Sequence, residues 1–230
     1  MKRVDMDEIY RRMSRDGIPW NIEEPPQALV ELLETRAVQP CKAIDLGCGM
    51  GNYAIYLANQ GFDVTGVDIS PTAIRIAEEN AKQKGIRCRF VVANVLGELD
   101  EVRETFDFAF DWELLHHIFP KDRTKYVRNV YKKLSSRGSY LSVCFSEKDK
   151  QFGGLGKYRR TRLGTLLYFS SEAELRELFD PYFTIQDLRT IQIAGKHIPH
   201  MAVYVFMRKK QSLKPHFVSS NLRRKTAEIC

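Results

Sequence analysis

The stretch Asp45-Leu46-Gly47-Cys48-Gly49-Met50-Gly51 decides the fold of this 230-residue chain. It follows a short apolar run, residues 43–46, and precedes a helical segment that starts at Asn52 and stops at Gly61. Alternating glycines permit a tight turn with positive backbone angles and let a ligand approach bare backbone. A strand, a glycine turn and a helix in this order predict the first part of a nucleotide-binding unit.

An acidic partner for this loop stands 21 residues after Gly47. Residues 63–67 predict a second strand, and Asp68 ends it. A carboxylate at that place can accept hydrogen bonds from both ribose hydroxyls of an adenosine. A dinucleotide site is the alternative, but it favours a third glycine five positions after the first, where this chain has Asn52.

The G-x-G-x-G pattern, with Asp45 two positions before it, resembles motif I of the class I S-adenosylmethionine-dependent methyltransferases. The resemblance runs over about 100 residues, from Ala43 to Phe145, and implies S-adenosyl-L-methionine as the cofactor. In that family the loop packs against the methionine part of the cofactor. The cofactor-binding residues that the resemblance implies are Trp20, Asp45, Gly47, Cys48, Gly49, Gly51, Asp68, Ile69, Asn94, Val95 and Asp111.

Further along the chain the resemblance becomes more specific. Asn94 matches the position whose Asp or Asn contacts the adenine amine, although a turn-forming Asn is an equal alternative. The segment from Trp112 to His117 resembles the small-molecule branch, whereas enzymes that methylate adenine or glutamine nitrogen carry Asn- or Asp-Pro-Pro-Tyr there. The usual Pro-Gly-Gly before the fifth strand is replaced by residues 136–138, Ser-Arg-Gly. Residues 20–26 and the loop after the fifth strand are loosely similar to thiopurine and tellurite-resistance methyltransferases.

Strands and helices alternate over most of the chain, which predicts a parallel sheet with helices on both faces. We expect an α/β fold: a Rossmann-like, doubly wound, seven-stranded sheet, mostly parallel with an antiparallel last strand. Residues 1–40 are expected to form a helical cap, and residues 41–210 the methyltransferase domain with a lid-like insertion at about 148–170. A basic, loosely held tail is expected at 211–230. The predicted strands are 43–46, 63–67, 87–92, 106–110, 139–145, 183–193 and 201–207, and the predicted helices are 5–15, 26–36, 52–60, 71–84, 121–134 and one that begins at Ser170 or Ser171.

The net charge of +7 is concentrated in two segments. Residues 208–230 carry +6 and residues 148–170 carry +5, so the rest of the chain is mildly acidic. This pattern is not that of a uniformly basic nucleic-acid binder, and nucleic acid is not expected as a partner. No apolar run approaches the ~20 residues that span a bilayer, and the first residues show no secretory signal. Five scattered cysteines favour reduced thiols, so we expect a cytoplasmic protein.

Methyl transfer from a sulfonium requires mainly alignment of the nucleophile and exclusion of water, so no metal is expected. His116 is the first candidate for a general base and His117 the second, because histidine titrates near neutrality. The alternative is that one His packs in the core and the other lies on the surface. The basic, glycine-rich segment after the fifth strand offers a lid that would bind an anionic acceptor, or else a solvated surface loop. Its candidate substrate-binding residues are Tyr158, Arg159, Arg160 and Tyr168.

The sequence therefore favours a methyltransferase that acts on an O, N or S atom of a small molecule. Two alternatives remain open: a protein or tRNA acceptor, suggested by the two basic segments, and a non-catalytic module that only binds the cofactor. The chain is expected to be a monomer or a homodimer.

Overall fold

The structure, a computed structural model, describes residues 5–97, 99–152 and 156–211. Residues 212–230 of the predicted tail and residues 153–155 of the predicted lid lie outside this range. The elements in chain order are α1 (Met6–Arg12), η1 (Arg15–Gly17), α2 (Gln27–Glu34), β1 (Lys42–Leu46), α3 (Asn52–Asn59), β2 (Asp63–Asp68), α4 (Pro71–Gln83), β3 (Arg89–Val92), β4 (Phe106–Trp112), η2 (Leu115–His117), α5 (Pro120–Lys133), β5 (Leu134–Phe145), β6 (Tyr158–Arg160), β7 (Leu166–Tyr168), α6 (Glu172–Phe179), β8 (Phe183–Ile193) and β9 (His200–Lys209).

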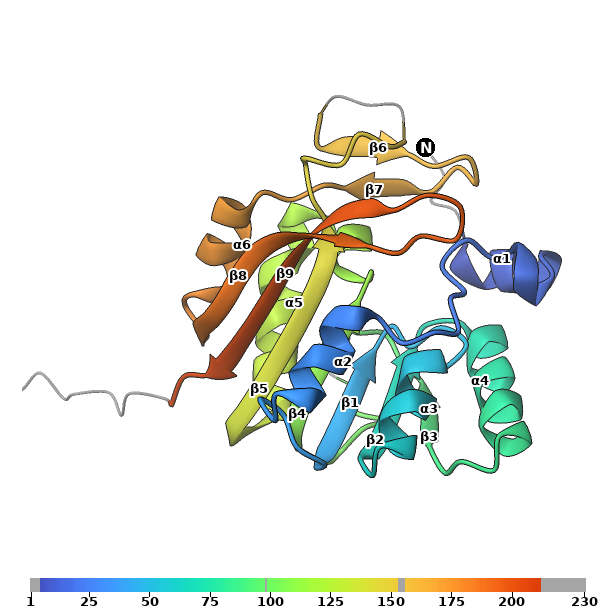
Figure 1. The fold of residues 1–230 in the computed structure, drawn as a ribbon, viewed down its shortest axis with the longest axis horizontal. Coiled ribbons are helices and arrows are strands. Elements are labelled where there is room, and N and C mark those ends of the chain that lie inside the picture. Colours follow the sequence, from blue (N-terminus) through green and yellow to red (C-terminus); the bar gives the residue numbers. More distant parts are fainter. Residues whose placement is uncertain (1–4, 98, 153–155, 212–230) are drawn as a thin grey trace, which may run out of the picture.

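Seven of the strands form one sheet in the order β3-β2-β1-β4-β5-β9-β8 (Figure 1). The pairs among β1 to β5 are all parallel. β9 runs antiparallel to both of its neighbours, β5 and β8. β8 therefore points the same way as the first five strands, and β9 runs against the other six. The predicted Rossmann-like sheet with an antiparallel last strand is confirmed.

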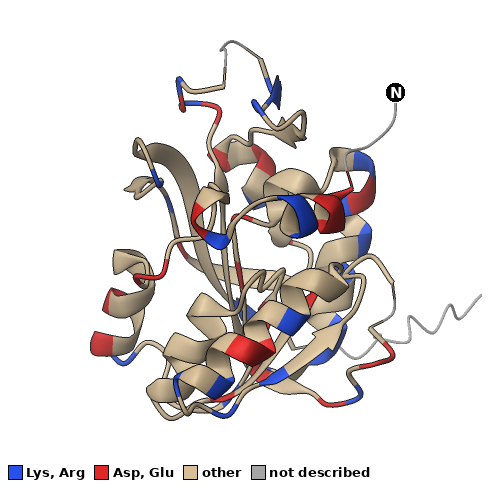
Figure 2. Ribbon diagram, turned by 90° about the vertical axis from the view of Figure 1, so that its right-hand side faces the viewer, with Lys and Arg blue, Asp and Glu red and all other residues tan. Residues whose placement is uncertain are grey.

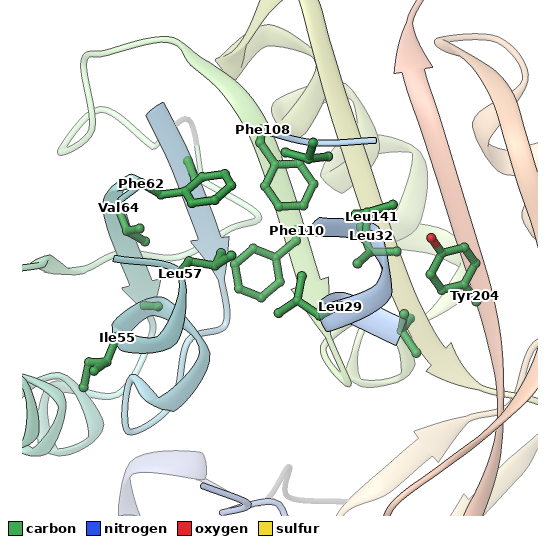
Figure 3. Close-up of a cluster of buried hydrophobic side chains, with 14 of the residues drawn as sticks. Leu29, Leu32, Ile55, Leu57, Phe62, Val64, Phe108, Phe110, Leu141 and Tyr204 are labelled. Carbon is green, nitrogen blue, oxygen red and sulfur yellow. The ribbon is translucent and has the colours of Figure 1, made fainter. Parts of the chain in front are cut away.

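Both faces of the sheet are buried, because successive side chains of a strand point to opposite faces. Phe108 and Phe110 of β4 face one layer, where they meet Leu29 of α2 and Leu57 of α3 (Figure 3). Ala109, between them in sequence, belongs to the other layer, which contains residues of α5 and α6. Helices on both faces thus fix the plane of the sheet and the direction of its strand ends.

The strand order predicts where a ligand binds to the sheet. β1 lies between β2 and β4, so the chain reverses its direction of travel across the sheet there, and ligands of such folds bind beyond the carboxyl ends of the strands at this point. α1 and a small hairpin, β6–β7, both lie on this side of the molecule (Figure 1). The hairpin lies within the segment that the sequence predicts only as a loop. Its two strands are three residues each, and their sequences do not alternate between apolar and polar residues.

Two helix starts follow the predicted capping pattern. Ser70 caps α4, with its hydroxyl accepting from the Ala73 N–H at 3.0 Å, and Pro71 stands at the first helical position. Ser171, one of the two predicted candidates, caps α6 in a capping box with Glu174. These caps define where the chain leaves β2 and where it enters the last helix.

Acidic and basic residues both lie on helices that face the viewer in Figure 2. Several form exposed ion pairs, among them Arg15–Glu79 at 2.6 Å and Arg75–Glu79 at 2.5 Å. Exposed pairs of this kind contribute little to stability. Within the part of the chain that the structure describes, no helix is both long and apolar enough to cross a membrane.

Candidate functional site

The glycine loop adopts the backbone conformation that its sequence predicts. Gly47, Gly49 and Gly51 have φ angles of 75°, 52° and 80°, in the left-handed region that favours glycine. The N–H groups of Gly47 and Cys48 both donate to the carbonyl of Val67, at 2.8 and 2.9 Å. These two bonds tie the loop to the end of β2, beside Asp68.

Asp68 holds the loop from the other side. Its carboxylate accepts from the Gly49 N–H through Oδ2 and from the Ser70 N–H through Oδ1, both at 2.9 Å. Burial raises the pKa of Asp68, and the two N–H groups partly offset that effect. Each carboxylate oxygen has a further lone pair, so the group can hold the loop and still accept from a ribose hydroxyl.

Two apolar side chains beside Asp68 are exposed. Ile69 is 57% accessible and Val92 is 42% accessible, although most large apolar side chains of the sheet are buried. The two strand ends lie together, because the Ala93 N–H donates to the Asp68 carbonyl at 2.9 Å. Exposed apolar surface next to the carboxylate that is predicted to bind the ribose fits the flat face of an adenine ring.

Asn94 and Val95 follow β3 on the same edge. The Asn94 side-chain oxygen accepts from the Leu96 N–H at 2.9 Å, which is the turn-forming role that the sequence left open. Asn94 is exposed, and its contact with adenine stays a prediction. Val95 is half-buried, and its carbonyl accepts from the Asn129 amide at 3.0 Å.

The interior of the site is acidic. Asp45 is buried, and burial raises its pKa, with the nearby charges of Asp68 and Asp111 adding to the effect. No recorded ion pair joins Asp45, Asp68 or Glu113 to any described Lys or Arg. Buried carboxylates without cationic partners are costly unless a bound cation compensates them. S-adenosylmethionine supplies two positive groups, an ammonium and a sulfonium, so these residues fit it.

The N-terminal segment covers the glycine loop. Tyr10 is buried, and its hydroxyl lies 3.0 Å from the place that a Cβ on Gly49 would take. Trp20 donates its indole N–H to that hydroxyl at 2.8 Å. Asp7 anchors the segment to the start of α4 by accepting from the Ser70 hydroxyl at 2.6 Å and from the Thr72 N–H at 2.9 Å.

This cover adds a residue that the sequence did not single out. Trp20 is predicted to bind the cofactor, whereas Tyr10 is the aromatic side chain of this N-terminal segment that contacts the loop. Tyr10 reaches the loop from 39 positions away, and an aromatic residue in a short helix gives no signal of that contact. Trp20 supports Tyr10 through the indole hydrogen bond, and its own contact with the cofactor stays a prediction.

The side chains of two other predicted cofactor residues, Asp111 and Cys48, contact other parts of the protein. The Asp111 carboxylate is fully buried and accepts from the hydroxyls of Tyr126, Tyr140 and Ser142. Burial raises its pKa to about 6 in spite of these donors. Asp111 therefore organises the packing of α5 and β5, and we do not include its side chain in the cofactor site. Cys48 stays in the loop, with its sulfur 3.0 Å from the place of a Cβ on Gly66.

The two histidines occupy different environments. His116 is 3% exposed, stacks on Phe145 with ring centroids 4.2 Å apart, and accepts from the Phe145 N–H through Nδ1 at 3.4 Å. Burial lowers its pKa well below the usual range, with His117 adding to the effect, so the ring is neutral and a weak base. This favours the packing role for His116. His117 is half-buried, and its role as a base stays a prediction.

The four predicted substrate residues divide into two pairs. Tyr158 is 54% exposed and packs edge-on against Tyr168, and Arg160 is exposed. Tyr168 is buried and donates its hydroxyl to Glu174 at 2.6 Å. Arg159 is buried, lies over the Phe169 ring, and donates from all three guanidinium nitrogens to backbone carbonyls of its own segment. Arg159 and Tyr168 thus make their described contacts inside the protein, and a role of either in substrate binding stays a prediction.

The basic character of this segment is also reduced by internal pairing. Lys157 lies 2.7 Å from Glu147 and 2.5 Å from Glu174. Lys148 lies 3.4 Å from Glu172. The cations therefore contribute less to an anion-binding surface than the sequence suggested. Among the described residues, no group of three or more His, Cys, Asp or Glu is arranged to hold a metal ion.

The two neighbouring arginines provide a direct test. We expect Arg159→Ala to lower the free energy of unfolding by about 2 kcal/mol or more, because it leaves several buried carbonyls without their donor. Arg160→Ala is expected to change it by less than about 0.5 kcal/mol, as an exposed substitution. Urea denaturation followed by circular dichroism measures both. Equal effects of the two substitutions would contradict the structural role of Arg159.

Comparisons with known proteins agree with this geometry. Residues 43–138 match the model of a methyltransferase domain family. The chain is 27% identical over 171 residues to a 2-heptyl-1-hydroxyquinolin-4(1H)-one methyltransferase of Mycobacteroides abscessus, covering 74% of this chain and 70% of that protein. It is 27% identical to an uncharacterized methyltransferase of Schizosaccharomyces pombe, covering 69% of this chain and 60% of that protein. Several other curated relatives are matched over less than two thirds of their length.

Among solved structures, one concerns the conversion of a disulfide bond into a thioacetal group during echinomycin biosynthesis. It superposes with a TM-score of 0.76 at 25% identity and covers 90% of this chain and 92% of that one. The match includes the regions outside the family model, on both sides of it. The fold, the glycine loop held by Asp68 and these likenesses together identify residues 43–138 as a class I S-adenosylmethionine-dependent methyltransferase domain.

Proposed function

We propose that the chain transfers a methyl group from S-adenosylmethionine to an O, N or S atom of a small molecule, by in-line displacement. The observation that carries this proposal is the group of carboxylates around the glycine loop that pair with no described Lys or Arg, together with the exposed Ile69 and Val92 beside Asp68. When bound, S-adenosylmethionine supplies an electrophilic methyl group on a sulfonium. The residues of the chain bind, orient and shield it.

Two segments that lie over the carboxyl ends of the strands, the N-terminal segment and the β6–β7 hairpin, support a small acceptor. The N-terminal segment packs on the loop through Tyr10, Ile18 and Met50, which form one apolar cluster. The β6–β7 hairpin is held above the other half of the edge by Arg159. Covers of this kind exclude water and suit an acceptor that can be enclosed. Within the described residues there is no separate domain that could recognise a macromolecule.

Relatives offer a first set of acceptors to test. The Mycobacteroides abscessus relative acts on 2-heptyl-1-hydroxyquinolin-4(1H)-one. A structural neighbour, the 1,6-didemethyltoxoflavin-N1-methyltransferase of Burkholderia thailandensis, was solved with its substrate and S-adenosylhomocysteine, at a TM-score of 0.63 and 23% identity, covering 88% of this chain and 81% of that one. The exposed ring of Tyr158, beside Phe119 and Tyr168, gives a planar acceptor a surface to stack on.

The test is a transfer assay with methyl-labelled S-adenosylmethionine. The acceptors are a panel of small phenols, N-hydroxyquinolones, heteroaromatic amines and thiols, with bulk protein and bulk tRNA as separate samples. We expect label in at least one small compound and none in protein or tRNA. Label only in a macromolecule would overturn the small-molecule acceptor. Tight cofactor binding without transfer to any sample would favour a module that only binds.

A further inference from the structure

Glu113 has an unusual backbone conformation. It directly follows β4, and its φ angle of 64° puts it in the left-handed region that side chains other than glycine rarely adopt. Such a conformation is strained and persists only where the surroundings impose it. Here the Glu113 N–H donates to the Val143 carbonyl at 2.8 Å, which extends the pairing of β4 with β5 by one residue.

The next residue fixes this turn against the glycine loop. The Leu114 side chain lies on Gly47, where Cδ1 would stand 2.8 Å from a Cβ added to that glycine. The absence of a side chain on Gly47 thus lets the segment after β4 close onto the loop. Glu113 is therefore held beside the part of the loop that packs against the methionine end of the cofactor in this family.

The Glu113 carboxyl group makes no recorded contact with a polar or charged group of the described residues. The residue is partly accessible, and no hydrogen bond or ion pair is recorded from its carboxylate to another described residue. The titratable groups that face this region are Tyr53, at the start of α3, and Asp45, at the end of β1. Burial raises the pKa of Tyr53, and the charges of Glu113 and Asp45 add to this effect. Burial raises the pKa of Glu113 itself to about 7, where a carboxylate can exchange protons near neutrality.

We propose that Glu113 faces the methyl-bearing end of the cofactor and accepts the proton of the acceptor during methyl transfer. The proposal rests on the function proposed above. In this step a lone pair of the acceptor's O, N or S atom forms the bond to the methyl carbon while the carbon–sulfur bond breaks and its electrons remain on sulfur. The acceptor's proton moves to a Glu113 carboxylate oxygen and is later released to water. As an anion, Glu113 also favours the sulfonium over the neutral thioether of the product.

The first experiment needs no acceptor. Calorimetry measures the dissociation constants of S-adenosylmethionine and S-adenosylhomocysteine at pH 8 for the wild type, Glu113→Gln and Glu101→Gln, the last an exposed control that removes the same charge. We expect Glu113→Gln to lower the preference for S-adenosylmethionine over S-adenosylhomocysteine by about tenfold, since the sulfonium loses a nearby anion. The control should keep the wild-type ratio. An unchanged ratio in a folded Glu113→Gln variant would overturn the proposal.

The second experiment uses whichever compound of the panel is methylated. We expect Glu113→Gln to lower kcat by about 10²- to 10⁴-fold with little change in the acceptor KM, and Glu113→Asp to recover part of the loss. Because the base must be deprotonated, the wild-type rate should rise with pH through about 7, and the Gln variant should lose that rise. A Gln variant with the wild-type rate and pH profile would refute proton transfer to Glu113. If the wild type methylates nothing, the proposed function fails by itself, and the affinity ratio alone decides on Glu113.

Discussion

Asp68→Asn is expected to weaken the binding of S-adenosylmethionine by more than about 100-fold, with little change in side-chain volume. The carboxylate accepts from the Gly49 N–H with one oxygen and from the Ser70 N–H with the other. An amide has one acceptor oxygen and one donor NH₂ group, so in either orientation an N–H group meets another N–H group. One of the two hydrogen bonds, to Gly49 or to Ser70, is lost, and the ribose loses an acceptor at the same time.

The matched control lies on the same strand. Asp63 is the first residue of β2 and is exposed, so Asp63→Asn removes the same charge far from the loop. Calorimetric titration with S-adenosylmethionine should show wild-type affinity for Asp63→Asn and a loss for Asp68→Asn, with both variants checked for folding by circular dichroism. Wild-type affinity in a folded Asp68→Asn variant would contradict the assignment of the adenosine pocket.

The sequence predicts those parts of the site in which the residue type has a single common structural role. Three glycines after a short apolar strand predict left-handed backbone, and all three adopt it. Ser70 before Pro71 predicts a helix cap, and the cap forms. In both cases the local chain carries the whole signal, because the atoms involved are only a few residues apart.

Local sequence pattern does not reveal which of the candidate side chains are buried. Arg159 and Arg160 are adjacent, yet one is buried and the other exposed, because they lie in a strand whose side chains alternate. A loop, which the sequence predicts for this segment, would have no such alternation. Asp111 is different, since β4 already alternates in the sequence, and the position of Phe110 on one face predicts that Asp111 points to the other.

Glu113 and Tyr10 could not be identified from the sequence for a third reason. Both act through contacts between distant segments, Glu113 where the turn after β4 closes onto Gly47 and Tyr10 where α1 crosses the loop. Each depends on a glycine whose missing side chain leaves room for the approaching segment. The glycines of the loop therefore allow other parts of the protein to pack closely against it, in addition to forming a predicted binding surface. Gly51 has the most crowded surroundings and is the strongest example.

Gly51→Ala is expected to lower the free energy of unfolding by about 3 kcal/mol, which combines a strained backbone with overpacking. Gly51 begins α3 with a φ angle of 80°. A Cβ there would lie 2.8 Å from Cζ of Phe90 and 2.9 Å from Cβ of Ala77. Phe90 cannot simply withdraw, because its ring also lies 2.8 Å from the place of a Cβ on Gly66. The ring is held between two glycines on neighbouring segments.

Gly85→Ala separates the two contributions, because Gly85 has a φ angle of 67° and nothing within 4 Å of its Cβ position. It should cost only about 1 kcal/mol, from backbone strain alone. Urea denaturation gives both values, and a double-mutant cycle with Phe90→Leu then tests the cause of the difference. In the Phe90→Leu background, Gly51→Ala should cost less than in the wild type, since the smaller side chain can give way. Equal costs for Gly51→Ala and Gly85→Ala, or an additive cycle, would show that Phe90 does not require glycine at position 51.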